Sequence, residues 1–153
     1  MLFRSWVVLK ADKFGVDKSQ IYVGGGSAGG HLAAAVAMIP NKSITQAPAG
    51  MLLFNPGVDI GRSARIQGLF RNQAEQYSPI EYVRPSLPGA WIVHGKADEV
   101  VPYSTVVDFC QRMVSAGNLC KLLGFDGAGH GFFNARRPAH DEVLGALLVH
   151  LDP

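Results

Sequence analysis

Short, continuously apolar runs alternate with longer amphipathic or alanine-rich segments along this chain. The apolar runs have the length and side-chain types of strands, which we expect at residues 21–24, 51–55, 90–94 and 121–125. The longer segments are typical of helices, which we expect at residues 2–14, 32–39, 102–116 and 139–151. Apolar strands that alternate with helices indicate a parallel sheet covered on both faces. The pattern therefore predicts an α/β fold, with a mostly parallel sheet of about four strands flanked by helices.

Residues 58–88 interrupt this alternation. They hold arginines, glycines and the turn-forming pair Ser78 and Pro79, without a strand or helix pattern. A connection of this length typically carries function instead of core. The sequence shows no internal repeat and no low-complexity tract, so we expect a single domain over residues 1–153.

The charges are balanced, since 14 Lys and Arg against 12 Asp and Glu give a formal net charge of +2. The basic residues are scattered and the only adjacent pair is Arg136 and Arg137, so we expect neither nucleic acid nor a membrane as a partner. No run approaches the roughly 20 apolar residues of a membrane span, and residues 1–10 show no leader pattern. These features predict a cytoplasmic location.

The two cysteines, Cys110 and Cys120, are too few for a disulfide scaffold. We expect two free, partly buried thiols. A bridge that closes the short loop between them is the alternative.

A serine in a glycine-rich turn is the first candidate for chemistry. Residues Gly25 to Gly29 match the G-x-S-x-G pattern between an expected strand and an expected helix. Such a turn lifts the hydroxyl of Ser27 above the sheet edge in a strained conformation, and it brings Gly25 and Gly29 too close to backbone for side chains. The N–H of Ala28 is then placed to donate to an oxyanion. A phosphate-binding loop is disfavoured, because no lysine follows the glycines.

An acid and a histidine follow Ser27 in the order Ser, acid, His. Asp98 lies just beyond the third expected strand and His130 just beyond the fourth, so both are expected at the same sheet edge as Ser27. Glu99 is the alternative acid. The remaining histidines are expected to be structural or solvated: His31, His94, His140 and His150.

Three segments of the chain resemble a known family. Residues 19–33, 94–102 and 127–132 look like the motifs of α/β-hydrolase esterases, above all of the carboxylesterase and acetyl-esterase branch. The resemblance spans nearly the whole chain. It implies a nucleophile at Ser27, an acid at Asp98 and a base at His130, with no metal and no organic cofactor.

Members of that family are longer, with several strands and a His-Gly-Gly-type loop before the elbow. The resemblance therefore implies an N-terminally truncated fold that lacks one oxyanion donor, a loss of about 100- to 1000-fold in rate. It also implies an open apolar edge on the strand at Ile21–Gly24, which invites pairing with another chain. We expect a homodimer that covers this edge.

These residues predict a serine hydrolase that cleaves small carboxylic esters of the acetyl type through an acyl-enzyme. Parts of 58–88, with Phe132 and Phe133, would line the substrate pocket. A peptidase similar to prolyl oligopeptidases is an alternative with the same triad, although the chain has no additional large domain for substrate selection. A truncated, inactive hydrolase-like domain that serves as an interaction module is the other alternative.

Overall fold

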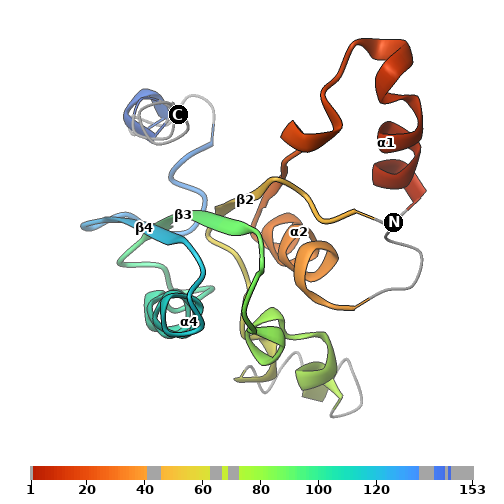
Figure 1. The fold of residues 1–153 in the computed structure, drawn as a ribbon. Coiled ribbons are helices and arrows are strands. Elements are labelled where there is room, and N and C mark those ends of the chain that lie inside the picture. The colour runs from red at the N-terminus through yellow and green to blue at the C-terminus, as the bar shows by residue number, and fades with distance from the viewer. Residues whose placement is uncertain are drawn as a thin grey trace.

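A computed structural model describes residues 2–40, 46–62, 67–68, 73–134, 140–143 and 145. Three helices and four strands form its frame (Figure 1): α1 (Leu2–Phe14), β1 (Val23–Gly26), α2 (Ala28–Met38), β2 (Gly50–Phe54), β3 (Gly89–Gly95), α4 (Tyr103–Ser115) and β4 (Cys120–Phe125). Most of the helix expected at 139–151 lies outside the described residues. Within the described part, no helix is both long and apolar enough to cross a bilayer.

The four strands form one parallel sheet in the order β1-β2-β3-β4. The register places Gly25 beside Leu53, Leu53 beside Ile92 and Ile92 beside Leu122, so all carboxyl ends reach one edge. This confirms the predicted fold class. The first strand is displaced from the expected 21–24 to Val23–Gly26, because the glycines that follow the apolar run continue the extended backbone.

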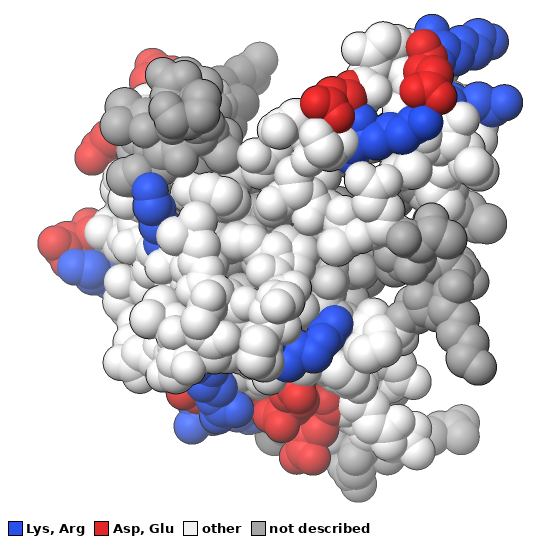
Figure 2. Space-filling model, in the orientation of Figure 1, with Lys and Arg blue, Asp and Glu red and all other residues white. Residues whose placement is uncertain are grey.

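Successive residues of β2 and β3 point to opposite faces of the sheet. They therefore belong to two separate apolar clusters, one on each face. Leu53 and Ile92 belong to the larger cluster, on the side where α2 and α4 pack against the sheet (Figure 1). Phe54 and Val93 belong to the smaller one, which also contains the aromatic side chains Trp91, Phe125, Phe132 and Phe133. Most of the face drawn in Figure 2 carries no charge, and residues of both signs are mixed over α1.

The described parts of the connection from 58 to 88 contain more secondary structure than the sequence predicts. It contains short 3-10 helices at Ile60–Arg62, Ala74–Tyr77 and Pro79–Tyr82. Val58 and Ile80 are buried, and the Ile80 N–H donates to the Val58 carbonyl at 3.0 Å. The expectation that this segment contributes little core is therefore wrong, since both side chains belong to the larger cluster.

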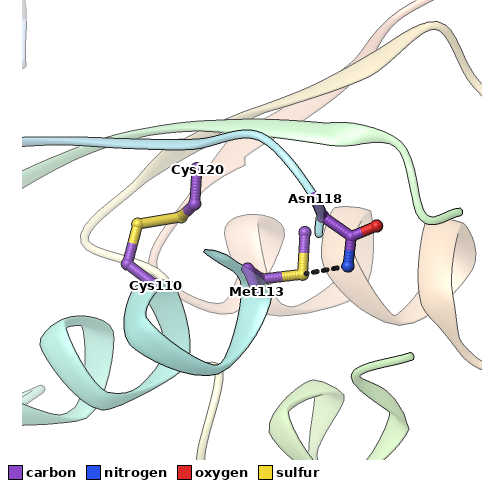
Figure 3. Close-up of a disulfide and its surroundings, with 4 residues drawn as sticks. All are labelled: Cys110, Met113, Asn118 and Cys120. Atoms are coloured by element: carbon purple, nitrogen blue, oxygen red, sulfur yellow. Dashed lines mark hydrogen bonds between the residues drawn. A yellow bond between two sulfur atoms is a disulfide. The ribbon is translucent and has the colours of Figure 1, made fainter. Parts of the chain in front are cut away.

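The expectation of free thiols is also wrong, because Cys110 and Cys120 form a disulfide (Figure 3). Cys110 lies on the buried face of α4 and Cys120 begins β4, so the turn between them brings their Cα atoms to 5.4 Å. Asn118 holds this turn: its amide donates to the Arg84 carbonyl at 2.8 Å and contacts the Met113 sulfur at 3.8 Å. Disulfides are rare in reducing compartments, so the bridge gives no support to a cytoplasmic location, which stays a prediction.

Reduction of this bridge should lower the free energy of unfolding by about 3 kcal/mol, because a disulfide restricts the unfolded chain. Urea unfolding of the wild type with and without dithiothreitol measures the change. The double variant Cys110→Ala/Cys120→Ala is the matched control and should not respond to the reductant. Equal midpoints for oxidised and reduced wild type would contradict the prediction.

An apolar groove adjoins β1, which pairs only with β2 among the described residues. The groove holds about 470 Å³ and is lined by Val7 of α1, by residues 21–24 and by one side of α2. Leu32 stands at this groove and is 62% exposed. The homodimer expected over this edge stays a prediction.

Sedimentation velocity of the purified chain tests the homodimer. We expect a species of twice the monomer mass, and Leu32→Glu should shift it to the monomer, because a carboxylate opposes apolar burial. Val114→Glu, an exposed change on α4, is the control and should leave the distribution as in the wild type. A wild type that sediments only as a monomer would end the dimer hypothesis.

Candidate active site

Ser27 occupies the turn between β1 and α2 in a strained conformation. Its φ of 54° and ψ of −119° lie outside the regions that side-chain-bearing residues usually adopt. Such a residue costs on the order of 1–3 kcal/mol and persists only when its surroundings hold it. The Ser27 N–H donates to the Phe54 carbonyl at 2.8 Å and the His31 N–H donates to the Ser27 carbonyl at 3.0 Å. The elbow is therefore fixed to β2 on one side and to α2 on the other.

The glycines around Ser27 are not equivalent. A Cβ at Gly25 would lie 2.6 Å from the Gly29 carbonyl carbon, so position 25 excludes a side chain, as predicted. A Cβ at Gly29 would meet nothing within 4 Å among the described residues, so the predicted restriction at position 29 is wrong. The close approach is between the two backbones, and only the Cβ of position 25 would point into it. Gly30 is also restricted, because its Cβ would lie 2.9 Å from the Gly25 carbonyl oxygen and 3.0 Å from the Pro56 side chain.

Three side chains from distant parts of the chain meet at the carboxyl edge of the sheet. His130 Nε2 lies 2.9 Å from Ser27 Oγ, and His130 Nδ1 lies 2.8 Å from Asp98 Oδ2. A carboxylate only accepts, so Nδ1 carries the hydrogen and donates to Asp98. Nε2 is then the acceptor for the Ser27 hydroxyl. The structure thus brings together the three residues expected at this edge, and exposed Glu99 is not the acid beside His130.

The Asp98 side chain is fully buried, with hydrogen bonds on both oxygens. Oδ1 accepts the backbone N–H groups of Val100 at 2.8 Å and Val101 at 2.9 Å. Burial by itself would raise the pKa of Asp98, but hydrogen bonds from Val101, His130 and Val100 outweigh it and hold the pKa below its usual value. The carboxyl group is therefore ionised at neutral pH.

Ala28 is the first residue of α2, directly after Ser27. The first N–H groups of a helix have no acceptor within the helix, and the helix dipole makes this end attractive to negative charge. The N–H of Ala28 is accordingly available next to the Ser27 hydroxyl.

Asn55, at the end of β2, is a residue of the site that the sequence analysis missed. It is fully buried with a φ of 42°, and its Oδ1 accepts the Gly95 N–H at 3.2 Å. Its Nδ2 lies 3.5 Å from His130 Nδ1. Both of these nitrogens carry hydrogens, so the contact packs against the ring and is not a second hydrogen bond. A polar residue that ends an apolar strand, before Pro56 and Gly57, was the available signal.

Other expected site residues occupy structural positions. Phe133 packs against Phe54 with ring centroids 5.2 Å apart, and Phe132 packs against Phe125 at 5.0 Å, both in the smaller apolar cluster. Their role in a substrate pocket stays a prediction. The His31 Nδ1 lies 2.9 Å from the Gly57 carbonyl and ties α2 to the loop after β2, consistent with the packing role expected for it.

A cavity of about 370 Å³ lies beside the turn that carries Asp98. Its walls come from residues 57–62, which include part of the connection expected to line a pocket, and from residues 100–105. Asp59 lies in this wall, where burial raises its pKa and Arg62, at 3.5 Å, opposes the rise. No group of three or more His, Cys, Asp or Glu in the described part of the chain is arranged to hold a metal ion.

The hydrogen-bonded carboxylate of Asp98 should make stability depend on pH. Since folding lowers the pKa of Asp98, the ionised group stabilises the fold above pH about 4, and the contribution is lost as pH falls through the lowered pKa. The stability advantage of wild type over Asp98→Asn should therefore shrink from neutral to acid pH in urea unfolding. Asp126→Asn, at a site 88% exposed, is the matched control. A difference that stays constant with pH would contradict this prediction.

The chain is similar to known proteins. Residues 3–82 match the family model described as alpha/beta hydrolase fold. Esterase LipC of Mycobacterium tuberculosis is 28% identical over 155 residues, which cover 84% of this chain and 38% of LipC.

Solved structures of a Thermogutta terrifontis esterase are similar over nearly all of this chain. The native form of this esterase, Est2, superposes with a TM-score of 0.87 at 34% identity, covering 97% of this chain and 60% of that one. The butyrate-bound form gives 0.85 at 34%, covering 97% and 62%. The form phosphorylated by paraoxon gives 0.83 at 36%, covering 96% and 58%.

The chain thus spans about 38% of LipC and about 60% of the Thermogutta esterase. The family match covers more than half of the present sequence, and the parallel sheet agrees with it. The chain therefore belongs to the alpha/beta hydrolase fold family.

Proposed function

We propose that this chain is a serine hydrolase that cleaves carboxylic esters through Ser27, His130 and Asp98. The observation that carries the proposal is the continuous hydrogen-bond path from the Ser27 hydroxyl through the His130 ring to the Asp98 carboxylate. In this arrangement the weak nucleophile Ser27 has a base, His130, within hydrogen-bond distance. Asp98 in turn fixes the orientation of that base. The resemblance to esterases from two organisms supports an ester as the substrate.

The reaction follows from the positions of these atoms. His130 Nε2 takes the proton of the Ser27 hydroxyl while Oγ forms a bond to the ester carbonyl carbon, and the carbonyl oxygen becomes an oxyanion. The Ala28 N–H donates to that oxyanion. Collapse of the intermediate breaks the carbon–oxygen bond to the alcohol, which leaves with the proton from His130. Water, deprotonated by His130, then releases the acid from the acyl-enzyme and restores Ser27.

Asp98 supports the step in which His130 becomes positively charged. The carboxylate accepts from Nδ1, so it selects the ring tautomer that leaves Nε2 free for the serine proton. It also stabilises the imidazolium by direct charge interaction, because the Asp98 side chain has no exposed surface and its charge is weakly screened. The lowered pKa of Asp98 keeps this charge present wherever the histidine works as a base.

The substrate class we propose is small esters with short acyl groups, of the acetyl type. A similar esterase is known with butyrate and with propionate bound, which supports a short acyl chain here. We expect p-nitrophenyl acetate and butyrate to be hydrolysed faster than esters of long fatty acids.

Replacement of the nucleophile tests the proposal directly. Ser27→Ala should lower kcat for p-nitrophenyl acetate by at least about 1,000-fold, because the remaining groups cannot form the acyl-enzyme. Ser104→Ala, an exposed serine on α4, is the matched control and should keep the wild-type rate. Equal rates for wild type and Ser27→Ala would refute the assignment of the nucleophile.

Covalent labelling gives a second readout that does not need turnover. Paraoxon phosphorylates the Thermogutta relative, so we expect Ser27 Oγ to bond to its phosphorus with release of one p-nitrophenolate per chain. Intact mass and peptide mapping locate the label, which should be absent from Ser27→Ala. A folded wild type that takes up no label would instead favour the inactive interaction domain.

A further inference from the structure

A second histidine, besides His130, lies against the Asp98 carboxylate. His94 belongs to β3, pairs in register with Gly124 of β4 and is fully buried. Its Nε2 lies 2.9 Å from the Val101 carbonyl oxygen and 3.3 Å from Asp98 Oδ2. The Tyr103 ring meets it edge-on, with centroids 5.8 Å apart. None of the proposed catalytic steps uses this ring.

The contacts of His94 fix its protonation state. A carbonyl oxygen only accepts, so Nε2 carries a hydrogen and donates it to Val101. Nδ1 is buried and has no hydrogen-bond partner among the described residues, so a hydrogen there would be a buried donor without an acceptor. Desolvation in this buried position holds the pKa of His94 below its ordinary value. The ring is neutral, as the Nε2–H tautomer.

The titratable groups that face His94 do not reverse this state. Asp98 and the backbone bond to Val101 favour a charged ring, whereas burial and the nearby His130 oppose it, and burial is the larger effect. Tyr103 contacts His94 through a T-shaped arrangement of the two rings. Because Nε2 carries its hydrogen, the His94 ring cannot accept a proton at the nitrogen that faces Asp98.

Val101 connects His94 to the acid. Its carbonyl accepts from His94, and its own N–H donates to Asp98 Oδ1 at 2.9 Å. The other oxygen, Oδ2, faces His94 Nε2 as well as His130 Nδ1. His94 therefore holds the turn that delivers the N–H donors to one carboxylate oxygen, and it presents its own N–H toward the other.

We propose that His94 is a positioning residue: its Nε2–H fixes the turn at 98–101 and keeps Asp98 Oδ2 directed at His130. The inference rests on the proposed function of Ser27, His130 and Asp98, and it adds a fourth residue to that site. The polar contacts of His94 are with Val101 and Asp98, so we expect its effect on the reaction to pass through Asp98.

Two substitutions distinguish the effect of the His94 N–H from the effect of the space that its side chain fills. His94→Leu fills the site without a donor, whereas the side-chain amide of His94→Gln can place an N–H close to the position of Nε2. We expect His94→Leu to lower kcat and the rate of Ser27 phosphorylation by paraoxon on the order of 100-fold, with KM little changed, because the base is misplaced. His94→Gln should retain most of both rates. Equal losses in the two variants would overturn the proposal.

A double-mutant cycle tests the route through Asp98. In the Asp98→Asn background, His94→Leu should cost little further activity, because the carboxylate that it positions is already gone. A full additional loss in that background would show that His94 acts elsewhere and would overturn the proposal. Circular dichroism melting checks that each variant is folded.

Nitrogen-15 NMR of histidine-labelled protein tests the proposed role of His94 without a measurement of turnover. The wild-type His94 ring should keep the Nε2–H tautomer from pH about 5 to about 8, a range that spans the titration of an ordinary histidine. The His130 Nδ1–H signal should persist in His94→Gln and weaken in His94→Leu. A His94 ring that titrates in this range, or a His130 signal lost in His94→Gln, would overturn the inference even if His94→Leu does not fold. Failure of wild type to hydrolyse esters or to be phosphorylated would instead refute the proposed function.

Discussion

The side chain of Asp98 is fully buried and carries a negative charge. A buried charge is stable only when hydrogen-bond donors surround it. Oδ1 receives two backbone N–H groups from the turn that follows β3, and Oδ2 receives the His130 ring from the loop after β4. His94, a buried residue of β3, donates a hydrogen bond to the Val101 carbonyl in that turn. The site therefore depends on one carboxylate whose donors come from β3 and from the segments that follow β3 and β4.

The parallel sheet makes this convergence possible. Because all four strands run in one direction, the segments that follow them leave from one edge, although Ser27 and His130 are 103 residues apart in sequence. Backbone strain lies at the same edge, where Ser27 and Asn55 both have positive φ. Hydrogen bonds join these two strained positions to the sheet, since Ser27 donates to Phe54 and the Asn55 N–H donates to Val93. The packed strands of the sheet supply the rigidity that keeps Ser27 and Asn55 in these strained conformations.

The sequence predicts the parallel sheet and the meeting of three side chains at its edge, because both follow from local patterns. Ser27, Asp98 and His130 each stand just past an apolar run, and parallel strands bring such positions together. The Cys110–Cys120 bridge could not be predicted in the same way, because the turn after α4 decides whether the two residues meet. Asn55 was missed because a single polar residue at a strand end has many ordinary explanations. Gly29 was misjudged because the direction of an absent Cβ is not visible in a motif.

His94 illustrates why the edge of the sheet departs from the rules that its interior obeys. Leu53 and Ile92, in the interior, are apolar and fully buried, and they need no polar partner. His94 is equally buried but leaves Nδ1 without a partner among the described residues, which costs stability that an apolar residue at this position would not. The same ring supplies the N–H that fixes Val101 and faces Asp98. Stability alone would favour an apolar side chain at position 94, so the histidine is best explained by what it does for the carboxylate.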